Sequence, residues 1–223
     1  EGPDGAWDRA LVRLSPGGSD ADTMREFDLK AEAFIEPAAG GFALPKAKSD
    51  VAYRSRDELL VGTDFGDGKS LTDSGYPRVV KSWRRGTPLS EARTVFEGEQ
   101  TDISASQYAY HDRGFLHEFQ HRAVTFYTAK YYYRTPTDLA TVSATDEPNA
   151  FAEVPVQDDA SFGTFADAAT IELRSDWTPS AADGARTYKA GSLLTAPVAD
   201  VMQENWSKLK VLFEPTESAS LQS

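Results

Sequence analysis

The strongest constraint on the fold is a pattern of short strands, with a side-chain period of two, that recurs along the chain. Apolar and β-branched residues gather in short runs, and the turns between them are rich in Gly, Pro and Asp. Such turns join antiparallel neighbours, so we expect an all-β protein built from antiparallel meanders. The clearest runs are 10–15, 23–29, 58–63, 78–83, 94–97, 103–105, 140–142, 170–174, 192–195 and 210–214, with an aromatic stretch at 123–134.

The strands fall into units that end alike. Each unit closes on two apolar residues, a Glu and a Pro or Gly, at 34–37, 95–98 and 212–215, with a shifted version at 152–155. The marker residues are 61, 56 and 61 residues apart; they are Glu36, Glu97, Glu153 and Glu214. A fixed period of four-strand units indicates a β-propeller. Closed propellers commonly hold ~4–8 blades, so we expect a partial propeller of about four blades.

These units set the expected domain organisation. The approximate blades are 1–37, 42–98, 101–156 and 157–215, and residues 216–223 are expected to start a further blade. The first unit lacks its first strand, and the chain does not begin with Met, so we expect a portion of a longer protein.

Two short helical segments are expected. Pro197 stands at a first-turn position before apolar residues spaced for one helical face, which predicts a helix inserted before the last strand. A further turn of helix is expected at Thr87-Pro88, with Thr87 as its N-cap. The apolar residues after Pro197 are Val198, Val201, Met202, Trp206 and Leu209.

Charge and composition exclude several classes of function. Lys and Arg number 23 against 35 Asp and Glu, for a net charge of −12. A phosphate backbone or an anionic membrane surface would repel such a chain, so we expect neither nucleic acid nor a membrane as partner. The absence of cysteine excludes disulfides, thiolate metal sites and Cys nucleophiles. We expect a cytoplasmic protein, although a cysteine-free chain suits the periplasm equally.

One local motif matches a catalytic pattern. Residues 117–121 read HEFQH, the zinc-protease motif in which His117 and His121 would bind the metal from a helix and Glu118 would be the base. The metzincin continuation is absent, because Val124 and Tyr127 stand where Gly and His are needed. The following residues favour a strand, on which the two histidines would lie ~13 Å apart, too far for one zinc. We expect solvated strand histidines, and a zinc metallopeptidase remains the alternative.

Other motif-like segments are expected to be loops. Residues 66–70 resemble the end of a phosphate-binding loop, but Thr63 replaces the required first Gly. The triplet 64–66 resembles the kinase metal-binding triplet without a catalytic loop before it. No Gly-x-Ser-x-Gly nucleophile elbow occurs, and no Ser, His and Asp residues are singled out as a triad.

Longer stretches of the chain resemble one family. They are similar, in the same order, to the propeller of bacterial prolyl-oligopeptidase-like serine peptidases. The segments that carry the resemblance are 25–29, 41–49, 61–66, 71–89, 95–99, 173–177, 190–194 and 212–216.

The resemblance implies a function for a longer protein. Such peptidases pair a seven-bladed propeller with a following α/β-hydrolase domain that carries the Ser-Asp-His triad, and the propeller restricts the active site to short peptides. This chain has no stretch that matches the hydrolase domain, so no catalytic, cofactor-binding or metal-binding residue is assigned to it. We expect the substrate-gating portion of a peptidase, inactive by itself. Its implied partners are the peptide substrate, the missing catalytic domain and a second copy of the chain. A non-enzymatic propeller that binds a partner is a further alternative.

Overall fold

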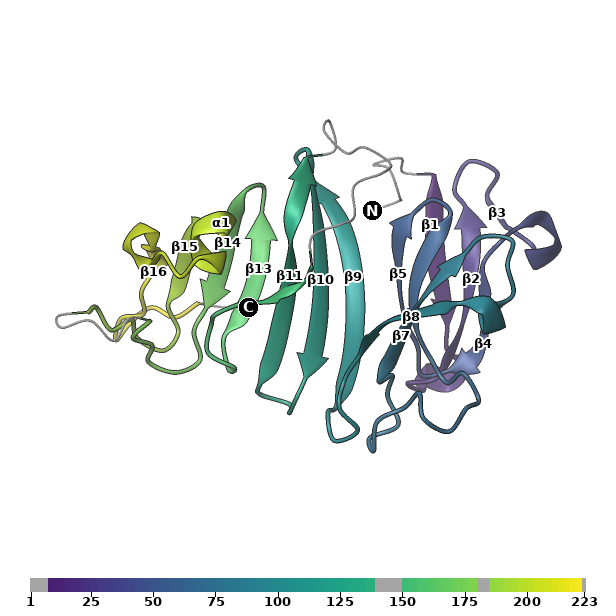
Figure 1. Cartoon of the computed structure of the whole chain (residues 1–223), viewed down its shortest axis with the longest axis horizontal. Coiled ribbons are helices and arrows are strands. Elements are labelled where there is room, and N and C mark those ends of the chain that lie inside the picture. Colours follow the sequence, from purple (N-terminus) through teal and green to yellow (C-terminus); the bar gives the residue numbers. More distant parts are fainter. Residues whose placement is uncertain (1–7, 139–149, 180–184, 222–223) are drawn as a thin grey trace. The chain divides into compact units, whose positions relative to one another are not determined.

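The computed structural model describes residues 8–138, 150–179 and 185–221, and within them it is mostly β-strand in four antiparallel sheets (Figure 1). The predicted all-β propeller fold is confirmed in its strand content. The expected strand at 140–142 lies outside the described residues. The chain divides into two compact units, which are described separately. The first unit is Glu1–His111 with Glu118–Val124, and the second is Asp112–His117 with Thr125–Ser223.

The first sheet is organised around β2. One edge of β2 pairs with β1 along its length, and the other edge pairs with β3 and then with β4. The Cα partners Arg25–Ala43 and Met24–Leu44 place β4 in this sheet, whereas we expected residues from 42 onward to belong to the second blade. The strands are β1 Arg9–Leu14, β2 Asp22–Asp28, β3 Ala33–Phe34 and β4 Ala43–Ala47.

The second sheet is a plain meander with the order β5-β6-β7-β8. The predicted strands at 58–63, 78–83 and 94–97 are confirmed as β6, β7 and β8. The expected helical turn is present at Leu89–Glu91, but Pro88 precedes it, and the Thr87 hydroxyl donates to the Arg84 carbonyl instead of capping it. The strands are β5 Asp50–Ser55, β6 Glu58–Gly62, β7 Val79–Arg84 and β8 Arg93–Glu97.

The core of the first unit lies between these two sheets. Phe42 and Trp83 meet edge to face, with ring centroids 4.9 Å apart. Burying a large apolar side chain stabilises a fold by ~1.5–3 kcal/mol, so this cluster joins the two sheets strongly. The buried members of the cluster are Met24, Phe42, Leu44, Leu59, Val61 and Trp83.

The third sheet has the order β12-β11-β10-β9, and the division between the units falls within β10. The predicted aromatic stretch at 123–134 is interrupted, because β10 ends at Ala123 and a turn precedes β11. Thr125 closes this turn, since its hydroxyl accepts hydrogen bonds from the backbone N–H groups of Tyr127 and Thr128. The strands are β9 Ser104–Asp112, β10 Phe115–Ala123, β11 Ala129–Asp138 and β12 Ala152–Glu153.

The fourth sheet is a meander in the second unit, with the order β13-β14-β15-β16. The predicted helix after Pro197 is confirmed as α1, Val198–Met202, but it is shorter than its apolar pattern indicated. Glu204 has a left-handed φ of 55°, which no helix continues through, and a separate 3-10 turn follows at Trp206–Lys208. The strands are β13 Ser161–Phe165, β14 Ala168–Glu172, β15 Leu193–Pro197 and β16 Lys210–Phe213.

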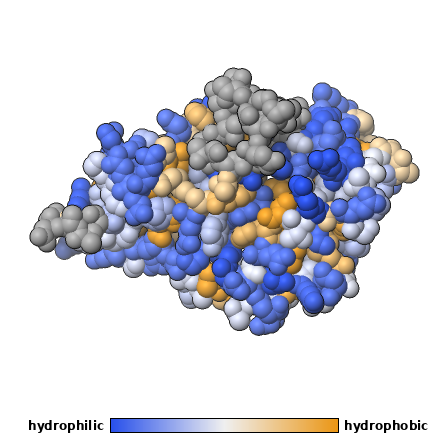
Figure 2. Space-filling model, viewed as in Figure 1, coloured by the Kyte–Doolittle hydropathy of each residue, from blue (hydrophilic) through white to orange (hydrophobic). Residues whose placement is uncertain are grey.

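The end of the described chain differs from expectation. Thr216 and Ala219 form an isolated bridge around a tight turn, in place of the strand expected to start a further blade. Among the described residues, no helix has the length and apolar character needed to cross a membrane. Hydrophilic residues predominate on the face drawn in Figure 2, with apolar residues scattered among them.

Candidate functional site

The HEFQH segment lies on β10, which is a strand. Successive side chains of a strand project to opposite faces, so Glu118 points away from the face that His117 occupies. The zinc-protease motif needs a helix to bring its two histidines together, and these residues do not form one. Within the described ranges, no group of three His, Asp or Glu side chains is placed to hold a metal ion.

His117 is a core residue, which corrects the expectation of a solvated histidine. Its side chain is completely buried in the second unit, and its Nδ1 lies 2.7 Å from the hydroxyl oxygen of the buried Tyr133. Burial lowers the pKa of His117, and the nearby Asp112 carboxylate opposes this effect only in part. His117 is therefore favoured in its neutral form, as a hydrogen-bonded part of the core.

Glu118 belongs to an ion-pair network of the first unit. Arg54 donates from Nε to Glu118 at 3.0 Å and from Nη1 to Glu58 at 3.1 Å, so it bridges two carboxylates. Ser82 donates its hydroxyl proton to the same Glu58. Burial raises the pKa of Glu58, but the hydrogen bond from Ser82 and the charge of Arg54 outweigh it, and the net pKa is below its ordinary value. Glu118 is thus placed as an ion-pair partner of Arg54.

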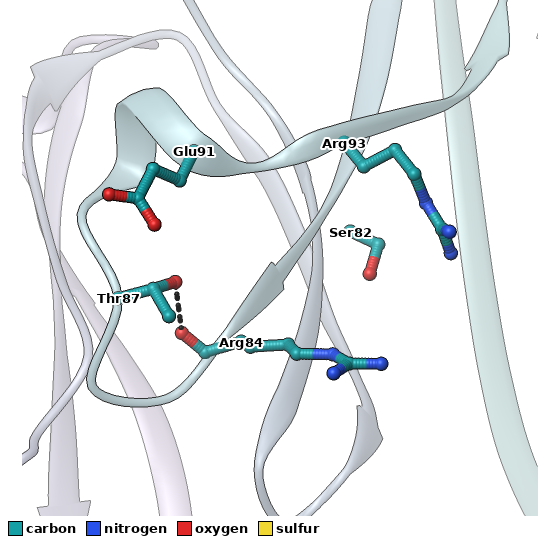
Figure 3. A pocket seen from close by; sticks show the side chains of 5 residues that line it. All are labelled: Ser82, Arg84, Thr87, Glu91 and Arg93. Atoms are coloured by element: carbon teal, nitrogen blue, oxygen red, sulfur yellow. Dashed lines mark hydrogen bonds between the residues drawn. The ribbon is translucent and has the colours of Figure 1, made fainter.

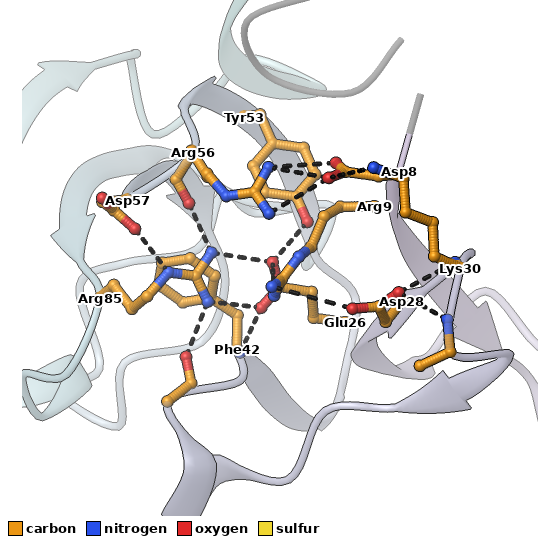
Figure 4. A network of polar contacts seen from close by, with 12 residues as sticks. Asp8, Arg9, Glu26, Asp28, Lys30, Phe42, Tyr53, Arg56, Asp57 and Arg85 are labelled. Atoms are coloured by element: carbon orange, nitrogen blue, oxygen red, sulfur yellow. Dashed lines mark hydrogen bonds and ion pairs between the residues drawn. The ribbon is translucent and has the colours of Figure 1, made fainter. Parts of the chain in front are cut away.

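A second network centres on Glu26, a completely buried carboxylate of β2 (Figure 4). Arg85, which follows β7, donates to both of its oxygens, from Nη1 at 2.6 Å and from Nη2 at 2.8 Å. The Tyr53 hydroxyl donates to the same carboxylate at 2.8 Å, and the Phe42 backbone N–H donates at 3.1 Å. The guanidinium of Arg85 also lies over the Phe42 ring, 4.3 Å from its centroid. This cluster fastens the first sheet to the second.

The electrostatics of the Glu26 cluster favour the charged pair. Burial alone raises the pKa of Glu26, but the hydrogen bonds from Arg85, Tyr53 and Phe42 outweigh it and hold the pKa below its ordinary value. Burial and the neighbouring Glu26 carboxylate raise the pKa of Tyr53, so that its phenol stays protonated and donates. A bidentate Arg–carboxylate pair fixes orientation as well as distance. The network therefore provides a rigid junction between adjacent blades.

An open pocket of about 340 Å³ lies on the second sheet (Figure 3). Ser82 on β7 and Arg93 on β8 are directly opposite residues of paired strands, so their side chains share a face of the sheet. Arg84 lies two residues beyond Ser82 and projects to that same face. No histidine lines the pocket, and the Ser82 hydroxyl already donates to Glu58, so the lining suits binding rather than nucleophilic attack. The lining residues are Ser82, Arg84, Thr87, Glu91 and Arg93.

The motif-like segments 64–66 and 66–70 are turns, as expected. The Asp64 carboxylate accepts a hydrogen bond from the Gly66 N–H at 2.8 Å, and the Asp67 carboxylate accepts one from the Lys69 N–H at 2.9 Å. Such contacts are typical of Asx turns. Neither the Glu26 cluster nor the pocket carried a sequence signal, because their members are tens of residues apart or are ordinary surface residue types.

Two curated proteins are related to the chain in sequence, although no protein-family model matches it. It is 33% identical over 171 residues to an uncharacterised peptidase of Sinorhizobium fredii, covering 75% of this chain and 22% of that protein. It is 26% identical over 217 residues to an uncharacterised peptidase of Rickettsia prowazekii, covering 94% of this chain and 29% of that protein. The chain thus spans less than a third of the length of these relatives.

Three solved structures share the fold. A post-proline cleaving enzyme of Rickettsia typhi superimposes with a TM-score of 0.79 at 23% identity, covering 97% of this chain and 31% of that enzyme. A prolyl endopeptidase matches with a TM-score of 0.63 at 13% identity, over 100% of this chain and 30% of its own. Oligopeptidase B of Leishmania major matches with a TM-score of 0.59 at 16% identity, over 100% of this chain and 27% of that protein. The resemblance to the propeller of prolyl-oligopeptidase-like peptidases is confirmed.

Proposed function

We propose that this chain, a propeller segment related to the prolyl-oligopeptidase-like peptidases, is the substrate-gating portion of a longer serine peptidase that hydrolyses peptide bonds in short peptides. The observation that carries the proposal is the extent of the match. The fold of the post-proline cleaving enzyme covers 97% of this chain, while the chain accounts for only 31% of that enzyme. The remaining length leaves room for a separate catalytic domain.

The architecture of the first unit supports a gating role. A domain that admits peptides by size has to hold its blades at fixed spacing. The Glu26–Arg85 pair and the apolar cluster around Phe42 and Trp83 join two adjacent sheets in that way. We further propose that the chain alone does not hydrolyse peptides, because it carries no Gly-x-Ser-x-Gly elbow and its pocket holds no activated nucleophile.

The proposal is tested on both the whole protein and this segment. The protein encoded by the complete gene is expected to cleave a short proline-containing chromogenic peptide, and a serine-directed inhibitor is expected to stop it. It should cleave a peptide of thirty residues with a much lower kcat/KM. The 223-residue chain should show no turnover of either substrate.

Two results would contradict the proposal. The first is inhibitor-sensitive turnover by the 223-residue chain alone, which would place the catalytic residues within it. The second is an equal kcat/KM of the whole protein for the short and the long peptide, which would remove the gating role. A whole protein with no peptidase activity would instead favour the non-enzymatic propeller that binds a partner.

A further inference from the structure

Two arginines of the first unit differ from all the others in it. The unit contains ten arginines, and eight of them form ion pairs with carboxylates. Among the residues that the structure describes, Arg84 and Arg93 have no such partner, and both are exposed. In a chain with a net charge of −12, carboxylates are abundant, so two neighbouring arginines without one are unusual.

These two arginines line the same pocket. Figure 3 shows both guanidinium groups projecting to the same side, with the Ser82 side chain between those of Arg84 and Arg93. Glu91, the acidic member of the lining, lies on the loop and away from the two guanidinium groups. The positive end of the pocket is therefore open to a ligand.

The surrounding contacts among the described residues hold the pocket in shape without forming an ion pair to Arg84 or Arg93. Glu58, the cross-strand neighbour of Arg84, interacts with it electrostatically, but the hydrogen bonds to its Oε1 come from Ser82 and Arg54. The loop opposite is fixed by two hydrogen bonds, from the Trp83 indole N–H to the Thr87 carbonyl at 2.8 Å and from the Thr87 hydroxyl to the Arg84 carbonyl at 2.8 Å. The two guanidinium groups thus extend from a rigid pair of strands.

We propose that Arg84 and Arg93 form a binding site for a carboxylate, and that its ligand is the free carboxyl terminus of a peptide. Guanidinium groups present planar pairs of N–H donors that match the two oxygens of a carboxylate. The pocket volume of about 340 Å³ falls in the range of small-ligand sites and accommodates a residue or two beside the carboxylate. The assignment to a peptide, rather than to another acid, rests on the proposed function.

Calorimetric titration of the 223-residue chain tests the site. The ligands are an acetylated Gly-Pro-Ala peptide with a free carboxyl terminus, the same peptide as its terminal amide, and acetate. Loss of a hydrogen bond to a charged group lowers affinity by about tenfold or more. We expect the amide to bind at least about tenfold more weakly than the acid. Raising the salt concentration should weaken binding of the acid, because the site is exposed.

Three variants assign the site to its residues. Arg84→Gln and Arg93→Gln should each weaken binding of the acid by about tenfold. Arg25→Gln removes the same charge from the first unit without altering the pocket lining, and it should leave binding unchanged. All three changes are at residues outside the core, and a thermal melt of each variant checks its fold.

Each remaining outcome overturns the proposal. Equal binding of acid and amide would exclude a carboxylate site. If Arg25→Gln and Arg93→Gln weakened binding of the peptide acid equally, the effect would come from the net charge of the chain and not from the pocket. If acetate bound as tightly as the peptide acid, the site would recognise carboxylates in general and not the carboxyl terminus of a peptide. These titrations use the 223-residue chain and do not depend on whether the whole protein is a peptidase. A failure of the proposed function can therefore be distinguished from a failure of this site.

Discussion

Replacing Arg85 by Met should destabilise the first unit strongly. The substitution keeps an apolar stem over the Phe42 ring but removes both hydrogen bonds to the completely buried Glu26. Breaking a buried ion pair by removing one partner costs about 3–5 kcal/mol, because the remaining charge is left buried. Arg9, whose Nη1 lies 3.6 Å from Glu26, remains as a partner, so we expect the lower end of this range. Folded proteins are stable by only ~5–15 kcal/mol, so a large share of the stability would be lost.

The chain offers a closely matched control. Arg25 donates to Glu36 at 2.6 Å, the same distance as from Arg85 Nη1 to Glu26, and the Arg25 guanidinium also lies over an aromatic ring, that of Phe34, at 4.4 Å. The largest difference is burial, because the Glu36 side chain is 67% exposed and that of Glu26 is 0% exposed; Arg85 also donates to both oxygens of its carboxylate, whereas Arg25 donates to one. Exposed pairs contribute about 0–1 kcal/mol, so Arg25→Met should cost no more than that.

Urea unfolding followed by fluorescence measures both variants. The m-value of a protein this small is about 1–3 kcal/mol/M, so Arg85→Met should lower the midpoint by roughly 1 M or more. Arg25→Met should lower it by a fraction of that. Equal midpoint shifts in the two variants would refute the reasoning, because burial would then contribute nothing to the strength of the pair.

The pH dependence gives a second check on the same substitution. In the wild type the pKa of Glu26 is below its ordinary value of 4.5, so the pair contributes stability above that pH and loses it as the pH falls through the folded pKa. Without Arg85, burial is the largest remaining influence and raises the pKa of Glu26. The carboxylate can then take up a proton in mild acid. The cost of Arg85→Met should therefore be largest near pH 7 and smaller at pH 4.

Three further outcomes are expected. Gly98→Ala should destabilise the chain by about 1–3 kcal/mol in urea unfolding, because its Cβ would lie 2.7 Å from the Ala105 Cβ; Gly163→Ala, whose nearest contact is 3.2 Å, should cost less. Metal analysis after dialysis should find no stoichiometric zinc, and one zinc per chain that is lost on His121→Ala would support the metallopeptidase alternative. Light scattering should find a dimer formed through unpaired strand edges, and a monomeric mass that is unchanged on deleting residues 216–223 would exclude exchange of that tail.

The strands were predictable because their signals are local. Alternating apolar residues and the turn residues between them lie within a few positions of one another, and β6, β7 and β8 were found where the pattern placed them. Pairing is less local, and this explains the misplacement of β4. Its residues read as the start of a new unit, but β2, some twenty positions earlier, provides its hydrogen-bond partners.

The buried polar residues were not predictable for a different reason. Glu26 and Arg85 are 59 positions apart, and nothing in their local sequence separates them from surface residues of the same types. His117 matched a metal motif and was expected to be solvated, whereas it is buried against Tyr133. A sequence motif identifies residue types and their spacing. Whether those residues are buried depends on which strands pack against them, and this is not encoded in the motif. The candidate pocket was missed for the same reason, since its two arginines come together only through the pairing of β7 with β8.

The marker glutamates show what the sequence repeat does in the structure. Each one forms an ion pair with a basic residue that precedes it in the same blade: Glu36 with Arg25, Glu97 with Arg78, Glu153 with Lys130 and Glu214 with Arg186. All four glutamates are at least 38% exposed, so these pairs contribute little to stability. Their recurrence marks the same place in every blade, at or just beyond the end of β3, β8, β12 and β16. Within the described residues, neither the Glu26–Arg85 pair nor the lining of the Arg84–Arg93 pocket involves a marker glutamate. The repeated ion pairs therefore mark the ends of the blades, whereas the buried Glu26–Arg85 pair and the arginine pocket are separate features of the first unit.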